Sequence, residues 1–177
     1  SLESEGHTCA RSPGYEADDV IGTLAIQAVK RGLSVTVASA DKDMLQLVDH
    51  DVTVVSTKTG ATYATEADVV QKIGVRPYQV ADRLALAGDT ADGIARAPGV
   101  GPKHAAALLA AHGSLDGMVG PLADSESSEQ LAGATPRIAA ILREHWGQVL
   151  MCRKLTGLAD VPSLESVLDN LEKTMSE

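Results

Sequence analysis

The stretch LSVTVASADKDMLQLVDHDVTVVS, residues 33–56, decides the fold class. It opens and closes with short runs rich in Val and Thr, which are typical of buried strands. Between them DKDMLQLV indicates a helix, for which Asp41 is a good N-cap residue. A strand, a helix and a second strand predict a parallel βαβ unit. Because ligands of parallel sheets bind at the carboxyl ends of the strands, Asp41 and Asp43 are expected at such an edge.

Helices are predicted on both sides of this unit. Upstream, EADDVIGTLAIQAVKRG places its apolar residues on one helical face and stops at Gly32. Downstream, GATYA is a candidate third strand, and TEADVVQKIG predicts a helix that ends at Gly74. RPYQVADRLALAG predicts another helix, with Pro77 in its first turn and Gly88 at its end. The first half is therefore expected to be α/β.

The second half predicts helices alone. An Ala-rich helix follows a loop marked by Gly and Pro, and a turn at Gly113 leads to another short helix. GPLADSESSEQLAGATP, residues 120–136, is the best linker candidate because it is polar and rich in Ser. RIAAILREHWGQVLMCRKL predicts a long final helix, and the residues after Pro162 are weakly amphipathic. We expect an α/β core in residues 1–88, a helical region in 89–156 and a tail in 157–177.

The composition is that of a globular protein with a core of small aliphatic residues. Of 177 residues, 44% are hydrophobic and 22% charged, with one Trp and no Phe. No apolar run is long enough to span a membrane, and the first residues lack the pattern of a secretion signal. Cys9 and Cys152 are far apart and have no metal-binding spacing, which favours reduced thiols. The absence of an initiator Met suggests a processed piece or a fragment of a longer protein.

Three short acidic clusters stand at the ends of predicted elements: Glu16, Asp18 and Asp19; Asp41 and Asp43; Asp89 and Asp92. Each cluster alone is typical of helix caps and loops. Gathered at one sheet edge, they would need cations, and oxygen ligands without His or Cys suit Mg²⁺ or Mn²⁺. Two such ions roughly 3.5–4 Å apart are the usual means of hydrolysing a phosphodiester. A metal-dependent nuclease is thus one reading of the clusters.

The stretch PGVGPKHA, residues 98–105, indicates a tight turn that leads into a helix. It is no Walker A loop, because Pro102 replaces a Gly and His104 replaces Ser or Thr. Backbone N–H groups at the helix start, with Lys103 in the first turn, suit a phosphate. An ordinary pair of helices joined by a Gly turn remains the alternative.

Four stretches together resemble the 5′-3′ exonuclease and flap endonuclease family: GYEADDVIGTLA, VASADKDMLQLV, LALAGDTADGI and GVGPKHAAALLAAHGSLDGM. This family includes the nuclease domain of bacterial-type DNA polymerase I and its stand-alone relatives, and the likeness covers roughly residues 13–155. It implies a PIN-like α/β core with a parallel sheet, followed by an all-helical, helix-hairpin-helix (helix–three-turn–helix) DNA-binding region. It also implies hydrolysis of 5′ ends and 5′ flaps on duplex or branched DNA with two Mg²⁺ or Mn²⁺ ions.

The resemblance assigns roles to individual residues. The ligands of the catalytic metal are matched by Glu16, Asp18, Asp19 and Asp41, and those of the second metal by Asp43, Asp89 and Asp92. The turn that grips the duplex backbone through a monovalent cation, K⁺, is matched by Gly99, Val100 and Gly101, with Lys103 as a phosphate contact. Without the seven carboxylates the net charge changes from −9 to −2. The basic residues expected along the DNA are Arg83, Arg96, Lys103, Arg137 and Arg143.

The family pattern begins with a strand that carries further Asp ligands, followed by a basic helical arch. The 177 residues of this chain match the pattern only after these two parts. We therefore expect this chain alone to bind duplex DNA weakly and to cleave it poorly or not at all. Two alternatives stay open: a non-catalytic remnant that holds duplex DNA, and a PIN-like ribonuclease, which the hairpin disfavours. A monomer associated with DNA inside the cell is expected, in the cytoplasm of a bacterium or in an organelle.

Overall fold

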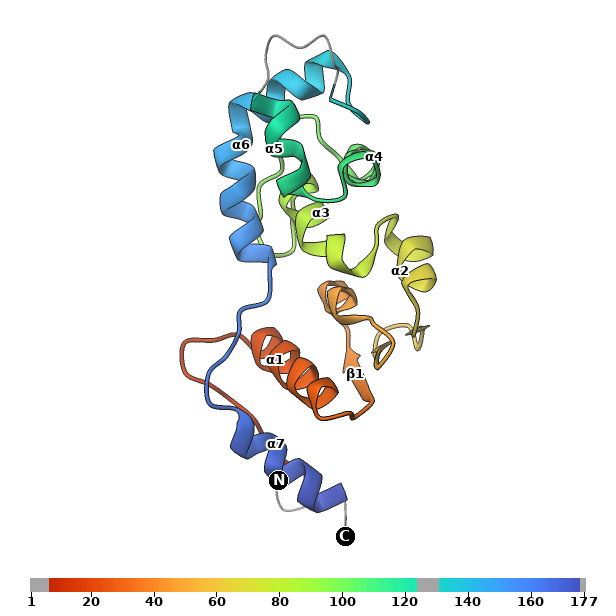
Figure 1. Ribbon diagram of the computed structural model, residues 1–177, viewed down its shortest axis with the longest axis vertical. Helices are drawn as coiled ribbons and strands as arrows, with labels where there is room; N and C mark the ends of the chain where they lie inside the picture. Colours follow the sequence, from red (N-terminus) through yellow and green to blue (C-terminus); the bar gives the residue numbers. More distant parts are fainter. Residues whose placement is uncertain (1–6, 124–130, 176–177) are drawn as a thin grey trace. The chain divides into compact units, whose positions relative to one another are not determined.

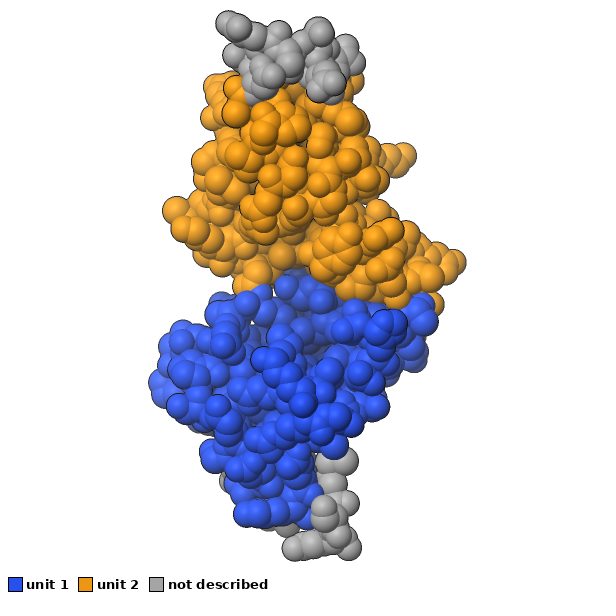
Figure 2. All heavy atoms as spheres, viewed as in Figure 1, with its two compact units in different colours: residues 1–65, 158–177 blue, residues 66–157 orange. Residues whose placement is uncertain are grey.

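The computed structural model describes residues 7–123 and 131–175 (Figure 1). The chain forms two compact units, unit 1 with residues 1–65 and 158–177 and unit 2 with residues 66–157 (Figure 2). The regions expected from the sequence met at residue 88, whereas the units divide at Thr65. The reason is that the helices between residues 66 and 87 pack with later helices of unit 2.

Unit 1 contains a small three-stranded sheet. β1 (Val35–Ser39) pairs in parallel with β2 (Val52–Ser56), and Val37 lies opposite Val54. β3 (Thr62–Tyr63) adds to the other side of β2 in the antiparallel direction, so the strand order is β1-β2-β3. The parallel pair and the short third strand predicted from the sequence are both present.

The connection between the parallel strands is a 3₁₀ helix, η2 (Lys42–Leu47), where the sequence predicted a helix of unspecified type. Asp41 caps it, since its Oδ1 accepts a hydrogen bond from the N–H of Asp43 at 2.8 Å. Met44, Leu45 and Leu47 are buried, which fixes this segment against the sheet. Asp41 and Asp43 thus lie just beyond the carboxyl end of β1, which ends at Ser39, as the sequence predicted.

Two helices complete unit 1. α1 (Ala17–Lys30) buries Val20, Ala25 and Ala28, and α7 (Glu165–Met175) is the segment predicted as a weakly amphipathic tail. The two helices contact each other. Arg31, which follows α1, joins them through ion pairs of Nη1 with Asp169 at 2.7 Å and with Glu172 at 3.1 Å. The tail thus folds back onto the first helix of the chain.

Unit 2 is entirely helical. Its elements are α2 (Glu66–Ile73), η3 (Pro77–Gln79), α3 (Val80–Ala87), α4 (Pro102–His112), α5 (Leu115–Ala123) and α6 (Pro136–Thr156). The predicted helix in residues 76–88 begins as the 3₁₀ turn η3 and continues as α3. The side chain of Gln79 donates to the carbonyls of Leu109 and Gly113 at 3.0 and 2.8 Å and so fastens this junction to the end of α4.

The linker predicted in residues 120–136 is helical at its start, which corrects the sequence analysis. α5 continues through Pro121 to Ala123, because Met118 and Leu122 are buried and their burial outweighs the helix-breaking tendency of Pro. Residues 124–130 lie outside the described residues. The linker ends at Thr135, whose Oγ1 accepts from the N–H of Ile138 at 3.3 Å and caps α6.

A polar network ties α3, α5 and α6 together. Asp82 on α3 is 4% exposed and accepts from the N–H of Leu115 at 2.9 Å and from Nε of Arg153 at 2.9 Å. Arg153 also donates to both carboxylate oxygens of exposed Asp116. Burial raises the pKa of Asp82, and its hydrogen bond to Leu115 opposes this, whereas the bond from Arg153 lowers the pKa of Asp116. The network fixes how the three helices pack.

Trp146, the single Trp of the chain, is half-buried on α6. In the described part of the chain, no helix is both long enough and apolar enough to cross a membrane.

Candidate metal and DNA-binding sites

A tight loop in residues 88–97 follows α3 and carries two of the candidate ligands. Asp89 and Ile94 form an antiparallel bridge, in which the N–H of each donates to the carbonyl of the other, at 3.0 and 2.7 Å. Oδ1 of Asp89 also accepts from the N–H of Ala91 at 2.9 Å. These bonds reverse the chain within a few residues and fix the backbone on which the two carboxylates stand.

The start of this loop requires a glycine. Gly88 has φ +73°, and a Cβ there would lie 2.7 Å from the backbone N of Arg96 and 2.8 Å from the carbonyl O of Ile94. A backbone approach this close is possible only without a side chain. On its other side the loop meets α6, where Sγ of Cys152 donates to the carbonyl of Ala95 at 3.5 Å.

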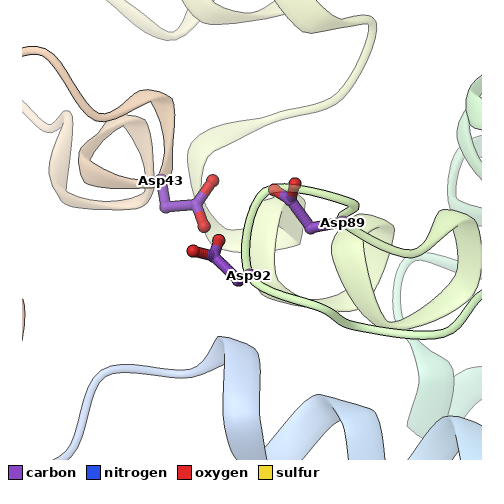
Figure 3. A group of neighbouring side chains, drawn as sticks. All are labelled: Asp43, Asp89 and Asp92. Carbon is purple, nitrogen blue, oxygen red and sulfur yellow. The ribbon is translucent and has the colours of Figure 1, made fainter.

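Asp89 and Asp92 form a carboxylate pair within unit 2. Their nearest oxygens lie within 4.8 Å of each other, and Asp89 is buried whereas Asp92 is exposed. Figure 3 shows both side chains rising from the loop, and it also draws Asp43, which belongs to η2 in unit 1. Like charges this close repel, and a cation bound to both would remove the repulsion. The donor set consists of oxygen alone, which fits Mg²⁺ or Mn²⁺.

The acidic pair beyond β1 is ordered by local bonds. The N–H of Asp41 donates to Oγ of Ser39 at 3.0 Å, while the Asp41 side chain caps η2. Asp43 has a side chain 15% exposed, and its Oδ1 lies 3.8 Å from Nζ of Lys42. This pair therefore stands on a defined backbone at the sheet edge.

The third cluster lies at the start of α1 in unit 1. Glu16 is the exposed N-cap residue, and Asp18 and Asp19 lie half-buried in the first turn. Within the described residues of unit 1, no three acidic, His or Cys side chains come close enough together to hold one ion. Unit 1 by itself thus does not gather the four residues matched to the catalytic metal, with Asp41 as the fourth.

The predicted DNA-binding turn has the expected backbone form. Gly99 has φ +76°, Val100 is fully buried and its N–H donates to the carbonyl of Ala97 at 3.0 Å. Gly101 is the N-cap of α4, whose first residue is Pro102. The first N–H groups of such a helix have no acceptor within it and can bind a phosphate.

The basic residues expected along DNA all belong to unit 2. Of these, Arg96, Lys103 and Arg137 are exposed. Arg143 is exposed as well, but its Nε donates to the carbonyl of Leu122 at 3.1 Å, and Arg83 is half-buried. Lys103 is the exposed Lys in the first turn of α4 and lies two residues after Gly101 in the sequence.

Family models cover the whole chain. The model of the 5′-3′ exonuclease N-terminal resolvase-like domain matches residues 1–74, and that of the 5′-3′ exonuclease C-terminal SAM fold matches residues 75–177. This chain belongs to the 5′-3′ exonuclease family. The resemblance stated from the four sequence stretches is confirmed.

Curated relatives in the family are longer than this chain. DNA polymerase I of Mycobacterium leprae is 40% identical over 169 residues, which cover 93% of this chain and 18% of that protein. The 5′-3′ exonuclease of Aquifex aeolicus is 42% identical over 118 residues, which cover 67% of this chain and 40% of that protein. The chain therefore spans less than half the length of either family member.

Solved structures share the fold of this 5′-3′ exonuclease family member. The bacteriophage T5 5′-exonuclease with bound zinc matches with a TM-score of 0.69 and 20% identity, over 92% of this chain and 58% of that chain. The T5 flap endonuclease in a complex with DNA and metal ions matches with a TM-score of 0.68 and 18% identity, over 92% and 60%. The expected architecture, a PIN-like α/β part followed by a helical region, is confirmed.

The sequence analysis of this family member missed residues that hold its elements together through close or distant contacts. Gly88 was read only as a helix end, and no local pattern marks its close approach to the backbone of Arg96. Cys152 and Thr23 were not singled out. Their partners are 57 and more than 130 residues away in the chain, so no local pattern marks them.

Proposed function

We propose that this chain carries the metal-binding and duplex-binding parts of a 5′-3′ exonuclease and flap endonuclease that acts in DNA replication and repair. The observation that carries the proposal is the order of features in unit 2. A loop with a carboxylate pair is followed at once by a tight turn that opens α4, in a chain that the two family models together match from end to end.

The carboxylates would hold two divalent ions, Mg²⁺ or Mn²⁺. We assign Glu16, Asp18, Asp19 and Asp41 to the surroundings of the first ion, and Asp43, Asp89 and Asp92 to the second. Such ions activate water and stabilise the oxygens of an in-line displacement. What the chain supplies is the placement of its carboxylates, through the cap of η2, the cap of α1 and the bridge across the loop in residues 88–97.

The hairpin turn would bind the backbone of duplex DNA. Gly99, Val100 and Gly101 would hold the duplex backbone through a monovalent cation, K⁺, and Lys103 would contact a phosphate. Contacts of this kind are independent of base sequence. We further propose a monomer that acts on DNA with a 5′ flap inside the cell.

Two alternatives predict different behaviour. A duplex-binding remnant without catalysis would bind DNA but would gain no stability from Mn²⁺. A PIN-like ribonuclease would use the carboxylates but has no need of the turn at Gly99. The loop and the turn lie next to each other in unit 2, which favours one activity that uses both.

Asp92→Asn should weaken Mn²⁺ binding by about tenfold or more, because the exposed ligand loses its charge and keeps its shape. Calorimetric titration of Mn²⁺ into wild type and variant measures this. Wild type should also melt at a higher temperature in millimolar Mn²⁺ than in EDTA, since an ion that binds only the folded state stabilises it.

The control for this variant is Glu144→Gln, which removes one exposed carboxylate on α6 outside the clusters. It should leave the Mn²⁺ affinity unchanged. Equal affinities for Asp92→Asn and wild type would reduce Asp92 to a loop residue without a metal role, and identical melting curves in Mn²⁺ and EDTA would contradict the metal sites.

Lys103→Ala should weaken binding of a labelled 5′-flap duplex and reduce the slope of log affinity against log salt by about 1, the value for one lost phosphate contact. Fluorescence anisotropy at several salt concentrations measures both quantities. Lys72→Ala, which removes another exposed cation of unit 2 on α2, should change neither.

The same flap substrate tests the reaction. Any release of the labelled 5′ fragment should require Mg²⁺ and be slower with Asp92→Asn. No binding of duplex DNA at low salt would remove the clamp from the proposal, and cleavage that persists in EDTA would remove the metals.

A further inference from the structure

A short segment of unit 1, residues 158–161, runs along one face of α1, and we name it the strap. Asp19 and Thr23 are one helical turn apart and therefore lie on the same face. The N–H of Ala159 donates to Oδ1 of Asp19 at 2.8 Å, and the N–H of Val161 donates to Oγ1 of Thr23 at 2.9 Å. Oγ1 of Thr23 in turn donates to the carbonyl of Ala159 at 3.4 Å.

Apolar contacts also hold the strap against α1. Gly22 lies between the two polar residues on α1, and a Cβ there would be 2.7 Å from Cδ1 of Leu158. Val161 is 1% exposed and packs with Val20 and Leu164 in a small core. Thr23 is 3% exposed, so its hydroxyl depends on the strap for both of its hydrogen bonds.

Both carboxylate oxygens of Asp19 accept hydrogen bonds from backbone N–H groups. Oδ1 accepts from Ala159 in the strap, and Oδ2 accepts from the N–H of Glu16 at 3.1 Å. The side chain therefore ties the N-cap residue of α1 to a segment about 140 residues further along the chain. Asp19 thus acts as a tether, by which we mean a side chain that links two segments of the chain through hydrogen bonds. Both of its carboxylate oxygens point toward N–H groups.

We propose that Asp19 is a positioning residue and that, with Thr23 and the strap, it sets the place of the first turn of α1 for metal binding. The inference rests on the proposed function, since it takes Glu16 and Asp18 as carboxylates that face a divalent ion. It changes the role of Asp19, which acts on the ion through its two neighbours.

Removal of the carboxylate should change the stability of the metal-free protein in opposite directions, depending on whether the residue is a ligand or a tether. Loss of a ligand relieves repulsion among like charges, so the metal-free protein keeps or gains stability. Loss of a tether breaks hydrogen bonds that hold the fold, so the metal-free protein loses stability. The melting temperature in EDTA therefore separates the two roles.

The experiment compares Asp19→Asn, Thr23→Val and Thr23→Ser by calorimetric melting in EDTA and by Mn²⁺ titration at a temperature where all are folded. Asp19→Asn and Thr23→Val should each melt about 3–6 °C below wild type in EDTA. Asp92→Asn, the ligand for comparison, should not melt lower. Thr23→Val should also bind Mn²⁺ about threefold to tenfold more weakly, and Thr23→Ser, which keeps the hydroxyl, should restore both values.

Val54→Ala provides the control for stability alone, because it weakens the core of the sheet in the same unit. It should melt lower and bind Mn²⁺ as wild type does. Asp19→Asn melting at or above wild type in EDTA would make Asp19 a direct ligand and overturn the proposal. Thr23→Val with a normal Mn²⁺ affinity would reduce the strap to a structural contact and also overturn it.

Failure of the proposed function has a different signature. If wild type binds no Mn²⁺, the metal sites are absent and the positioning role falls with them, whatever the melting temperatures. If wild type binds Mn²⁺ and Asp92→Asn weakens it while Thr23→Val does not, the metal sites stand and the strap proposal alone is contradicted.

Discussion

Gly88→Ala is expected to destabilise unit 2 by about 2–5 kcal/mol and to weaken Mn²⁺ binding at the loop in residues 88–97. The variant incurs two costs. Its φ of +73° disfavours any residue with a Cβ, and that Cβ would stand 2.7 Å from the backbone N of Arg96. Since the contact is backbone, relief requires the loop to open, and this would displace Asp89, the next residue. Urea unfolding and Mn²⁺ titration measure the two effects.

Gly93→Ala is the matched control, because Gly93 lies in the same loop. It has φ +68° but no atom within 4 Å of the position of a Cβ. It should therefore show the conformational cost alone, about 1 kcal/mol, with little change in Mn²⁺ affinity. Equal losses in the two variants would mean that the close approach at Gly88 does not hold the loop.

Asp82→Ala is expected to destabilise unit 2 by about 2–4 kcal/mol. The change removes the partner of the N–H of Leu115 and of Nε of Arg153, both at 2.9 Å, from a position that is 4% exposed. The N–H at the start of α5 would then be buried without an acceptor. Urea unfolding followed by circular dichroism measures the loss.

Asp116→Ala separates this effect from the surface ion pair. Asp116 contacts the same Arg153 but its side chain is 71% exposed, and exposed pairs contribute less than about 1 kcal/mol. A loss after Asp82→Ala no larger than that after Asp116→Ala would contradict a buried tie between α3, α5 and α6.

The architecture follows from local patterns to a large extent. Val-rich runs on either side of a capped helix predicted the parallel pair, and Gly residues at positive φ marked the ends of α2, α3 and α4 as expected. Local sequence patterns failed to predict the extent of an element where the burial of its side chains determines that extent. α5 runs through Pro121 because Met118 and Leu122 pack inward, a fact that no turn signal near residue 120 expresses.

The candidate site is only partly readable from the sequence. Motif order indicates which carboxylates to consider, and Asp89 and Asp92 do lie together in unit 2. The direction of a side chain depends on distant partners. Asp19 accepts a hydrogen bond from the N–H of Ala159, 140 residues away, and no local pattern in the sequence indicates this contact. The ligand roles of all seven acidic residues stay predictions.

The placement of Trp146 gives the molecule a built-in reporter of one half only. It is the single Trp, and it lies half-buried on α6 in unit 2. Its fluorescence during unfolding therefore follows the helical unit. The sheet and its acidic edge contain no Trp and contribute no Trp fluorescence. Far-ultraviolet ellipticity follows both units. Since coincident transitions are the mark of a single cooperative step, one sample tells whether the two units lose their structure together or one after the other.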